Sequence, residues 1–145
     1  DQIQFRFSAT GRNAVDVAKC ASGGEMSRIM LSLKAMMAKY TNMPTMIFDE
    51  IDSGISGIAA SVVGKKLSEI AENHQIICIT HLPQIAAYGQ HNYKIEKHSD
   101  ESMTYTTVTA LSEDQKIDEI ARLLGGTNIT ETTLASAREL VEASK

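Results

Sequence analysis

Two short apolar runs on either side of a helix-length segment constrain the fold of this chain most. Residues 45–49 and 75–80 are almost continuously apolar, and residues 58–73 between them have the spacing of a helix. A strand, a helix and a second strand in this order form a βαβ unit. Strands that are apolar throughout are typical of a parallel sheet covered on both faces. We therefore predict an α/β fold with a mostly parallel sheet flanked by helices.

Acidic side chains and one histidine follow these two strands. Asp49, Glu50 and Asp52 come at the end of the first run, and His81 comes at the end of the second. The carboxyl ends of parallel strands lie at one edge of a sheet, where open α/β proteins bind their ligands. One carboxylate can support Mg²⁺, and a second can orient and deprotonate a water molecule that attacks a phosphate. A solvated acidic turn and a surface histidine are the simpler explanations, and both stay open at this point.

A serine and two glycines, Ser22, Gly23 and Gly24, precede a segment with helical spacing. In residues 25–40 the apolar positions recur every three or four residues, which predicts an amphipathic helix with its methionines in the core. The start of a helix presents unpaired N–H groups and a partial positive charge, and glycines let a phosphate approach the backbone. This segment is therefore either an anion-binding helix start or a plain serine-capped one.

The remaining segments predict further elements of the same single domain, residues 1–145. They are, in chain order, a half-buried strand (2–8), a loop (9–23), an antiparallel edge hairpin (93–97 and 105–110), a helix opened by a capping box of Ser112 and Gln115 (to 124) and a final helix (131–143).

Composition excludes several classes of protein. The chain has 145 residues, with 14 Lys and Arg against 18 Asp and Glu, and its basic residues are scattered. We therefore do not expect this segment to bind nucleic acid directly, because such binding usually needs a basic face. Cys20 and Cys78 lie far apart, which argues against a structural zinc site. No apolar run reaches the roughly 18 residues of a membrane span, so no membrane contact is expected.

Four motifs in chain order resemble those in the C-terminal half of an ABC-type ATPase head. They are the signature motif (Ser22-Gly23-Gly24-Glu25), Walker B (Met46-Ile47-Phe48-Asp49-Glu50), the D-loop (Asp52-Ser53-Gly54) and the H-loop (Thr80-His81). Residues 21–30, 48–57, 80–87 and 120–126 are similar, more specifically, to the RecN family of bacterial DNA-repair proteins, which are SMC-like ATPases. Transporter subunits typically have a proline after the Walker B acids, where this chain has Ile51.

The resemblance implies a dimer of heads that sandwiches two ATP molecules with Mg²⁺. ATP binding would close the heads and hydrolysis would reopen them, in double-strand-break repair by recombination. Glu50 would be the catalytic base, His81 would contact the γ-phosphate, and Asp49 would support Mg²⁺. The signature residues would act on the nucleotide of the second copy, and the D-loop would link the two sites. The implied nucleotide-binding residues are Ser22, Gly23, Gly24, Glu25, Asp52 and Ser53. Such a protein would be cytoplasmic and nucleoid-associated, and would reach DNA through its complete chain.

The sequence also departs from the family pattern. It contains no P-loop pattern and no long heptad coiled coil, both of which lie N-terminal to this region in the family. We therefore expect the C-terminal lobe of a longer head, which needs its P-loop lobe as a partner and is inactive alone. The alternatives are a transporter nucleotide-binding subunit, a non-catalytic dimerisation module, or an unrelated phosphate-binding protein in which the two apolar strands are not parallel neighbours.

Overall fold

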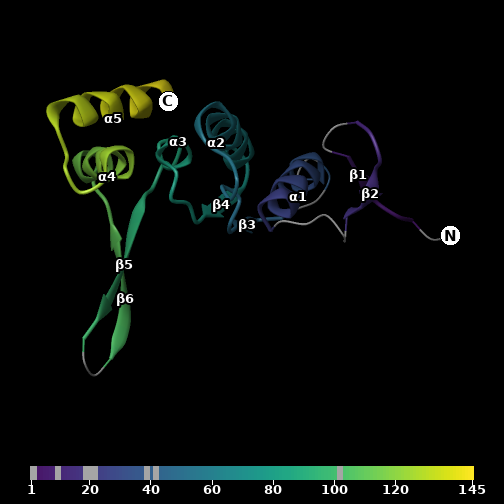
Figure 1. Ribbon diagram of the computed structural model, residues 1–145, viewed down its shortest axis with the longest axis horizontal. Helices are drawn as coiled ribbons and strands as arrows, with labels where there is room; N and C mark the ends of the chain where they lie inside the picture. Colours follow the sequence, from purple (N-terminus) through teal and green to yellow (C-terminus); the bar gives the residue numbers. More distant parts are fainter. Residues whose placement is uncertain (1–2, 9–10, 18–22, 38–39, 41–42, 101–102) are drawn as a thin grey trace. The chain divides into compact units, whose positions relative to one another are not determined.

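The computed structural model describes residues 3–8, 11–17, 23–37, 40, 43–100 and 103–145. The chain divides into two compact units, one of Asp1–Ile55 with Ile70–Thr80 and the other of Ser56–Glu69 with His81–Lys145. Figure 1 labels the elements, which are β1 (Arg6–Phe7), β2 (Val15–Asp16), α1 (Gly23–Met37), β3 (Thr45–Phe48), α2 (Gly57–Ala71), β4 (Gln75–Cys78), α3 (Pro83–Ala86), β5 (Tyr93–Ser99), β6 (Thr104–Ala110), α4 (Glu113–Gly125) and α5 (Glu131–Ala143).

The central element of the first unit is a parallel pair of strands. β3 and β4 pair in parallel from Thr45 opposite Gln75 to Phe48 opposite Cys78, and α2 connects them along the chain. The predicted strand–helix–strand order is confirmed, and the alternative in which these strands are not parallel neighbours is excluded. Because the pair is parallel and in register, both strands end at the same edge.

The larger, mostly parallel sheet of the prediction is not formed by the residues that the structure describes. Their strands make three sheets of two strands each, and only β3–β4 is parallel. The hairpin of β5 and β6 is antiparallel, as predicted, but it is a sheet of its own rather than the edge of the parallel one. One face of β3–β4 is apolar and open, with Ile47 61% and Ile79 47% exposed. A parallel sheet is normally covered on both faces, so this pair lacks part of its usual surroundings.

The N-terminal prediction was wrong in extent. The strand was expected over residues 2–8, and within the described residues 3–8 only Arg6–Phe7 forms a strand. It pairs with Val15–Asp16 in a segment that was expected to be a loop. Ile3 is 85% exposed, and Phe5 is also largely exposed. The alternation of apolar residues predicts a strand only where one face is buried, and these side chains have no such face.

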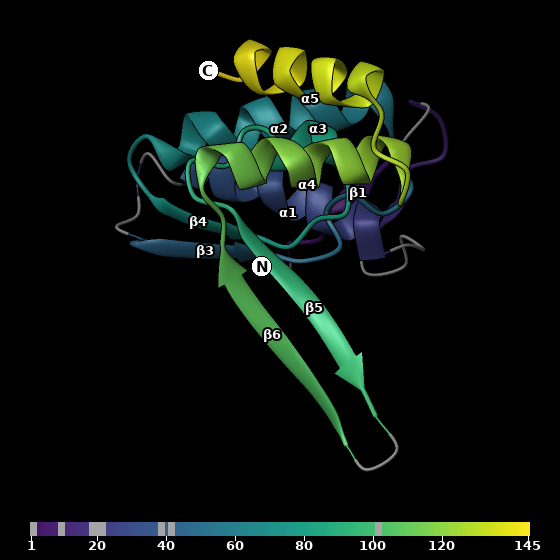
Figure 2. The same ribbon diagram turned by 90° about the vertical axis from the view of Figure 1, so that its left-hand side faces the viewer.

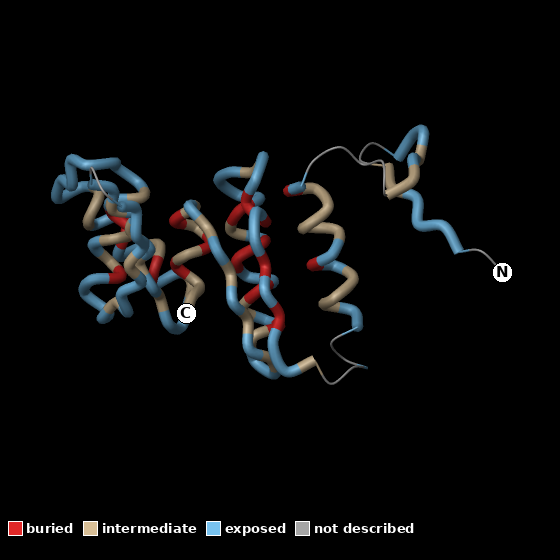
Figure 3. Tube along the Cα trace, turned by 90° about the horizontal axis from the view of Figure 1, so that it is seen from below, coloured by how far each residue is buried: buried red, intermediate tan, exposed pale blue. Residues whose placement is uncertain are grey.

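Helix α1 has fewer buried side chains than its spacing predicts. The helix begins at Gly23, two residues before the predicted start. The ammonium group of Lys34 lies 5.0 Å from the centre of the Phe48 ring, which locates β3 beside the helix. The expectation that the methionines are core residues was wrong for Met30, Met36 and Met37, which are exposed. Figure 3 shows most of α1 as intermediate or exposed.

The second unit is organised around two packed helices. Figures 1 and 2 both show α4 and α5 side by side, with the hairpin of β5 and β6 extending from them. Their shared core contains Ile120, Ala121, Ala137 and Val141. The capping box of Ser112 with Gln115 opens α4 as predicted. None of the described helices is long and apolar enough to cross a membrane.

Candidate functional site

An acidic loop, residues 49–53, follows β3 at the edge where β3 and β4 both end. The side chains of Asp49 and Glu50 are exposed there. Asp49 Oδ1 accepts a 2.9 Å hydrogen bond from the Glu50 backbone N–H, and Ser53 N–H donates to the Glu50 carbonyl at 3.1 Å. These bonds close a tight turn over residues 50–53. The turn leaves two carboxylates facing solvent at the edge where α/β proteins bind ligands.

The backbone of Glu50 is strained. Its φ angle is +54°, in the left-handed region that L-residues other than glycine seldom adopt. A residue held there costs about 1–3 kcal/mol, and such strain is concentrated at functional sites. A glycine would adopt this backbone without the cost. The presence of glutamate therefore points to a need for its side chain at this position.

The start of α1 lies directly against this loop in the same chain. A Cβ atom at Gly23 would lie 2.8 Å from Glu50 Oε2. A Cβ atom at Gly24 would collide with the backbone carbonyl oxygen and the Cβ atom of Ser53. The sequence predicts either an anion-binding helix start or a plain serine-capped one here, and the two glycines also allow close packing of the chain's own acidic loop. This second requirement cannot be read from the sequence.

The contact at Gly24 predicts a cost for the smallest substitution. We expect Gly24→Ala to lower the free energy of unfolding by about 1–3 kcal/mol, because the added methyl group meets backbone atoms that cannot rotate away. Gly125→Ala is the comparison, since Gly125 is also helical but the three atoms nearest to its added methyl all belong to the Thr133 side chain, the closest at 2.7 Å, and none to the backbone. Thermal melting of the two variants tests the difference. Equal melting temperatures would contradict the packing described here.

A buried carboxylate anchors the loop on its other side. Asp52 is only 5% exposed, and its Oδ2 accepts a 2.6 Å hydrogen bond from the Thr80 hydroxyl. Burial of a charged group requires such partners. Asp52 therefore fixes the loop to the end of β4, and its predicted contact with nucleotide stays a prediction. Burial, with Asp52 and Asp49 nearby, raises the pKa of the Cys78 thiol to about 12.

Two further residues hold the loop, and the sequence reading missed them. Arg28 Nη1 donates to the carbonyl oxygens of Ser53 at 2.6 Å and of Ile51 at 3.3 Å. The Ser27 hydroxyl donates to the carbonyl oxygen of Asp49 at 3.2 Å. A signal was present, because residues three and four positions after Gly24 lie on the same helix face.

The other predicted site residues are distributed as follows. Glu25 lies in the first turn of α1, where an acid favours the helix dipole. Ser22 lies outside the described residues. His81 is exposed and belongs to the second unit, whereas Glu50 belongs to the first. Contact of His81 with a shared ligand therefore stays a prediction.

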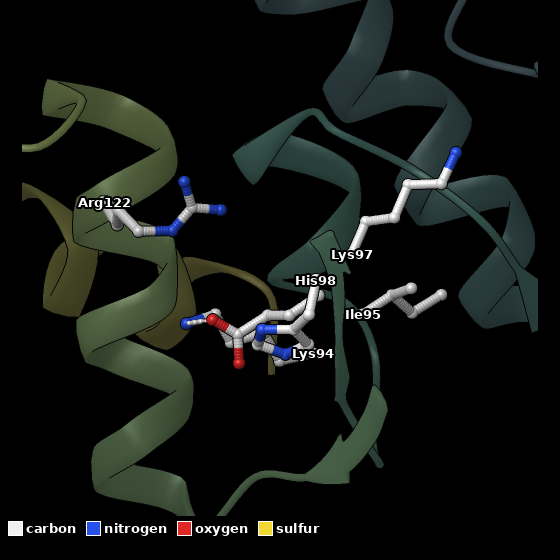
Figure 4. Close-up of a pocket in the computed structure, with 6 residues that line it drawn as sticks. Lys94, Ile95, Lys97, His98 and Arg122 are labelled. Atoms are coloured by element: carbon white, nitrogen blue, oxygen red, sulfur yellow. Dashed lines mark ion pairs between the residues drawn. The ribbon is translucent and has the colours of Figure 1, made fainter. Parts of the chain in front are cut away.

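A hollow between β5 and α4 is chemically different from this site. Figure 4 shows Arg122 on α4, with Lys94 and His98 of β5 on the side toward that helix and Lys97 pointing away from it. Two of the basic groups at this hollow are paired with acids, since Lys94 pairs with Glu96 at 2.8 Å and Arg122 pairs with Glu119 at 2.5 Å. The hydrogen bond from Lys94 lowers the pKa of Glu96. None of the residues predicted from the motifs lines this hollow.

The chain is similar to DNA repair proteins over nearly all of its length. It is 47% identical over 143 residues to the DNA repair protein RecN of Haemophilus influenzae, a match that covers 98% of this chain and 26% of that protein. It is 45% identical to RecN of Vibrio cholerae over 99% of this chain and 26% of that protein. It is 40% identical to RecN of Mycobacterium leprae over 100% of this chain and 24% of that protein. The chain thus spans about a quarter of the length of these curated relatives. No family model matches the chain.

A solved structure supports the fold. It comes from work on the ATP-driven dimerization and DNA-stimulated activation of SMC ATPases, and it matches 81% of this chain and 70% of that chain with a TM-score of 0.54. The sequence identity is 19%, so this likeness concerns the α/β fold alone. The chain is therefore similar, over nearly its whole length, to the C-terminal part of RecN DNA repair proteins.

Proposed function

We propose that this chain is the C-terminal lobe of an SMC-like ABC-type ATPase head in a bacterial cytoplasmic protein. The complete protein couples ATP binding and hydrolysis to head dimerisation in DNA double-strand-break repair. One observation carries the proposal: a strained, exposed Glu50 follows Asp49 at the shared end of two parallel strands, against the start of α1. The similarity to RecN proteins supports the same assignment.

Glu50 is the catalytic base in this proposal. Its exposed carboxylate can take the proton of a water molecule, and the left-handed backbone directs that carboxylate toward the start of α1. His81, in the second unit, contacts the γ-phosphate. Gly23 and Gly24, with Ser22 and Glu25, bind the nucleotide held by the second copy of the head.

The acidic loop suits Mg²⁺ through Asp49. The described residues contain no cluster of three or more potential metal ligands, so a metal ion here depends on water and phosphate oxygens for its other ligands. Asp49 is exposed and offers carboxylate oxygens, the donors that Mg²⁺ prefers. When bound, Mg²⁺ offsets the negative charge of the phosphates. This chain's part is to hold Asp49 at the strand end through the hydrogen bond from Glu50 N–H.

The open apolar face of β3–β4 supports the proposal that a partner lobe covers it. Ile47, Ile77 and Ile79 form an exposed apolar face on strands of a kind that is normally covered. In the proposal, the N-terminal P-loop lobe covers this face and extends the pair into a mostly parallel sheet.

The proposal predicts that the 145-residue chain alone hydrolyses ATP negligibly. The backbone and lysine of a P-loop hold the phosphates in ATPases of this class, and this sequence has no such motif. Turnover should appear when an N-terminal segment containing a P-loop is supplied, and it should require Glu50. Phosphate release by the purified chain, with and without that segment, is the measurement. Robust hydrolysis by the chain alone that depends on Glu50 would contradict the proposed division of the site.

A further inference from the structure

One turn of α1 holds the backbone of the acidic loop at three alternate residues. The carbonyl oxygens of Asp49, Ile51 and Ser53 all accept hydrogen bonds from Ser27 or Arg28. Arg28 Nη1 also lies 3.0 Å from the position of a Cβ atom at Gly24, one helical turn earlier. The guanidinium group therefore lies between the first turn of α1 and the loop that carries Glu50.

We propose that Arg28 is a positioning residue that couples the start of α1 to Glu50 within one copy of the head. This inference rests on the proposed function, in which the start of α1 binds the nucleotide of the partner copy. Movement of α1 upon that contact is then passed through Arg28 to the loop over residues 49–53. Occupation of one nucleotide site thus changes the position of the catalytic base in the other.

The surroundings of the loop make such transmission physically reasonable. On the side of β4, the hydrogen bond between Thr80 and buried Asp52 fixes the middle of the loop. On the side of α1, Arg28 binds the carbonyl groups on both sides of Asp52. Glu50 lies just before these anchors in a strained backbone conformation. A small shift of α1 against the fixed Asp52 therefore acts on a residue whose backbone is already far from its minimum.

Arginine suits this role better than lysine. Each terminal nitrogen of a guanidinium carries two N–H groups in a fixed plane, so one nitrogen can donate to two carbonyl oxygens. A lysine ammonium keeps the charge but has neither the planar fork nor the same reach. Arg28→Lys should therefore recover part of what Arg28→Gln loses.

The test uses the full-length protein and measures ATP turnover across a range of ATP concentrations, with ATP affinity measured separately. We expect Arg28→Gln to lower kcat roughly 10–100-fold, the scale of a misplaced catalytic group, with little change in ATP affinity. The Hill coefficient should fall from above 1 in the wild type to 1, and Arg28→Lys should lie between. Arg138→Gln is the control, because Arg138 is an exposed residue of α5 in the second unit.

Two results would overturn the inference. A wild-type Hill coefficient of 1 would show that the sites are not coupled. A Hill coefficient unchanged in Arg28→Gln, whatever its melting temperature, would show that Arg28 is only a structural brace. Failure of the proposed function is recognised separately, because Glu50→Gln would then turn over ATP as fast as the wild type. If Glu50→Gln is inactive while Arg28→Gln keeps its cooperativity, only the coupling inference fails.

Discussion

We expect Glu50→Gln in the full-length protein to lower ATP turnover by roughly 10²–10⁴-fold, the range for loss of a positioned general base. Glutamine has nearly the same shape as glutamate, so the packing against Gly23 is retained while the proton acceptor is lost. ATP binding and ATP-dependent dimerisation should survive, because neither needs the base. Steady-state phosphate release, together with direct measurement of ATP binding, separates the two effects.

A matched control distinguishes loss of the base from loss of negative charge. Glu72→Gln removes one exposed carboxylate from the segment after α2, outside the acidic loop, and should leave turnover unchanged. Glu50→Gly would relieve the left-handed backbone and raise stability while turnover stays low, since glycine adopts positive φ angles readily. Full activity of Glu50→Gln would remove Glu50 from the role of base.

The second large effect concerns the thiol of Cys78. Burial, together with the negative charges of Asp52 and Asp49, raises its pKa from an ordinary 9.0 to about 12. Only the thiolate reacts with iodoacetamide. At pH 8 we therefore expect Cys78 in the folded protein to be alkylated about a thousandfold more slowly than in the unfolded protein, as three pKa units imply. Peptide mapping by mass spectrometry separates Cys78 from Cys20.

The raised pKa of Cys78 also predicts that the folded protein loses stability as the pH rises. Above pH 9 the thiol of the unfolded chain loses its proton, whereas the folded chain keeps it up to about pH 12. The folded state then binds more protons, so the free energy of unfolding falls as the pH rises through this window. Cys78→Ala should lose this part of the alkaline destabilisation. Equal alkylation rates in folded and urea-unfolded protein would contradict the burial of the thiol beside the acidic loop.

Local sequence patterns predicted the elements that depend on local chemistry. The two apolar runs became parallel neighbours, and the capping box of Ser112 and Gln115 starts α4 where expected. The capping box depends on residues three positions apart, and the strand pairing follows from the common strand–helix–strand arrangement. The acids following β3 were likewise predicted to lie at the shared strand end, because parallel strands leave little choice.

Features that depend on distant partners were not predictable. The contacts of Arg28 with the loop link residues 23 and 25 positions apart, and no periodicity reports such pairs. Asp52 is buried, and its hydrogen bond with Thr80 joins residues 28 positions apart. The exposure of Met36 and Met37 was mispredicted because helical spacing marks an apolar face without saying what covers it.

The central claim is that the acidic loop of one copy and the signature residues of another complete one ATPase site. Two full-length variants test it, Glu50→Gln and Ser22→Arg, each expected to be inactive alone. After the two variants are mixed, about half of the dimers contain one copy of each variant. In such a dimer one of the two sites combines an intact Glu50 with an intact Ser22 from the other copy. We therefore predict recovery of up to about a quarter of wild-type turnover. If each copy instead builds its site from its own Ser22 and Glu50, the mixture stays inactive, and that result would contradict the account.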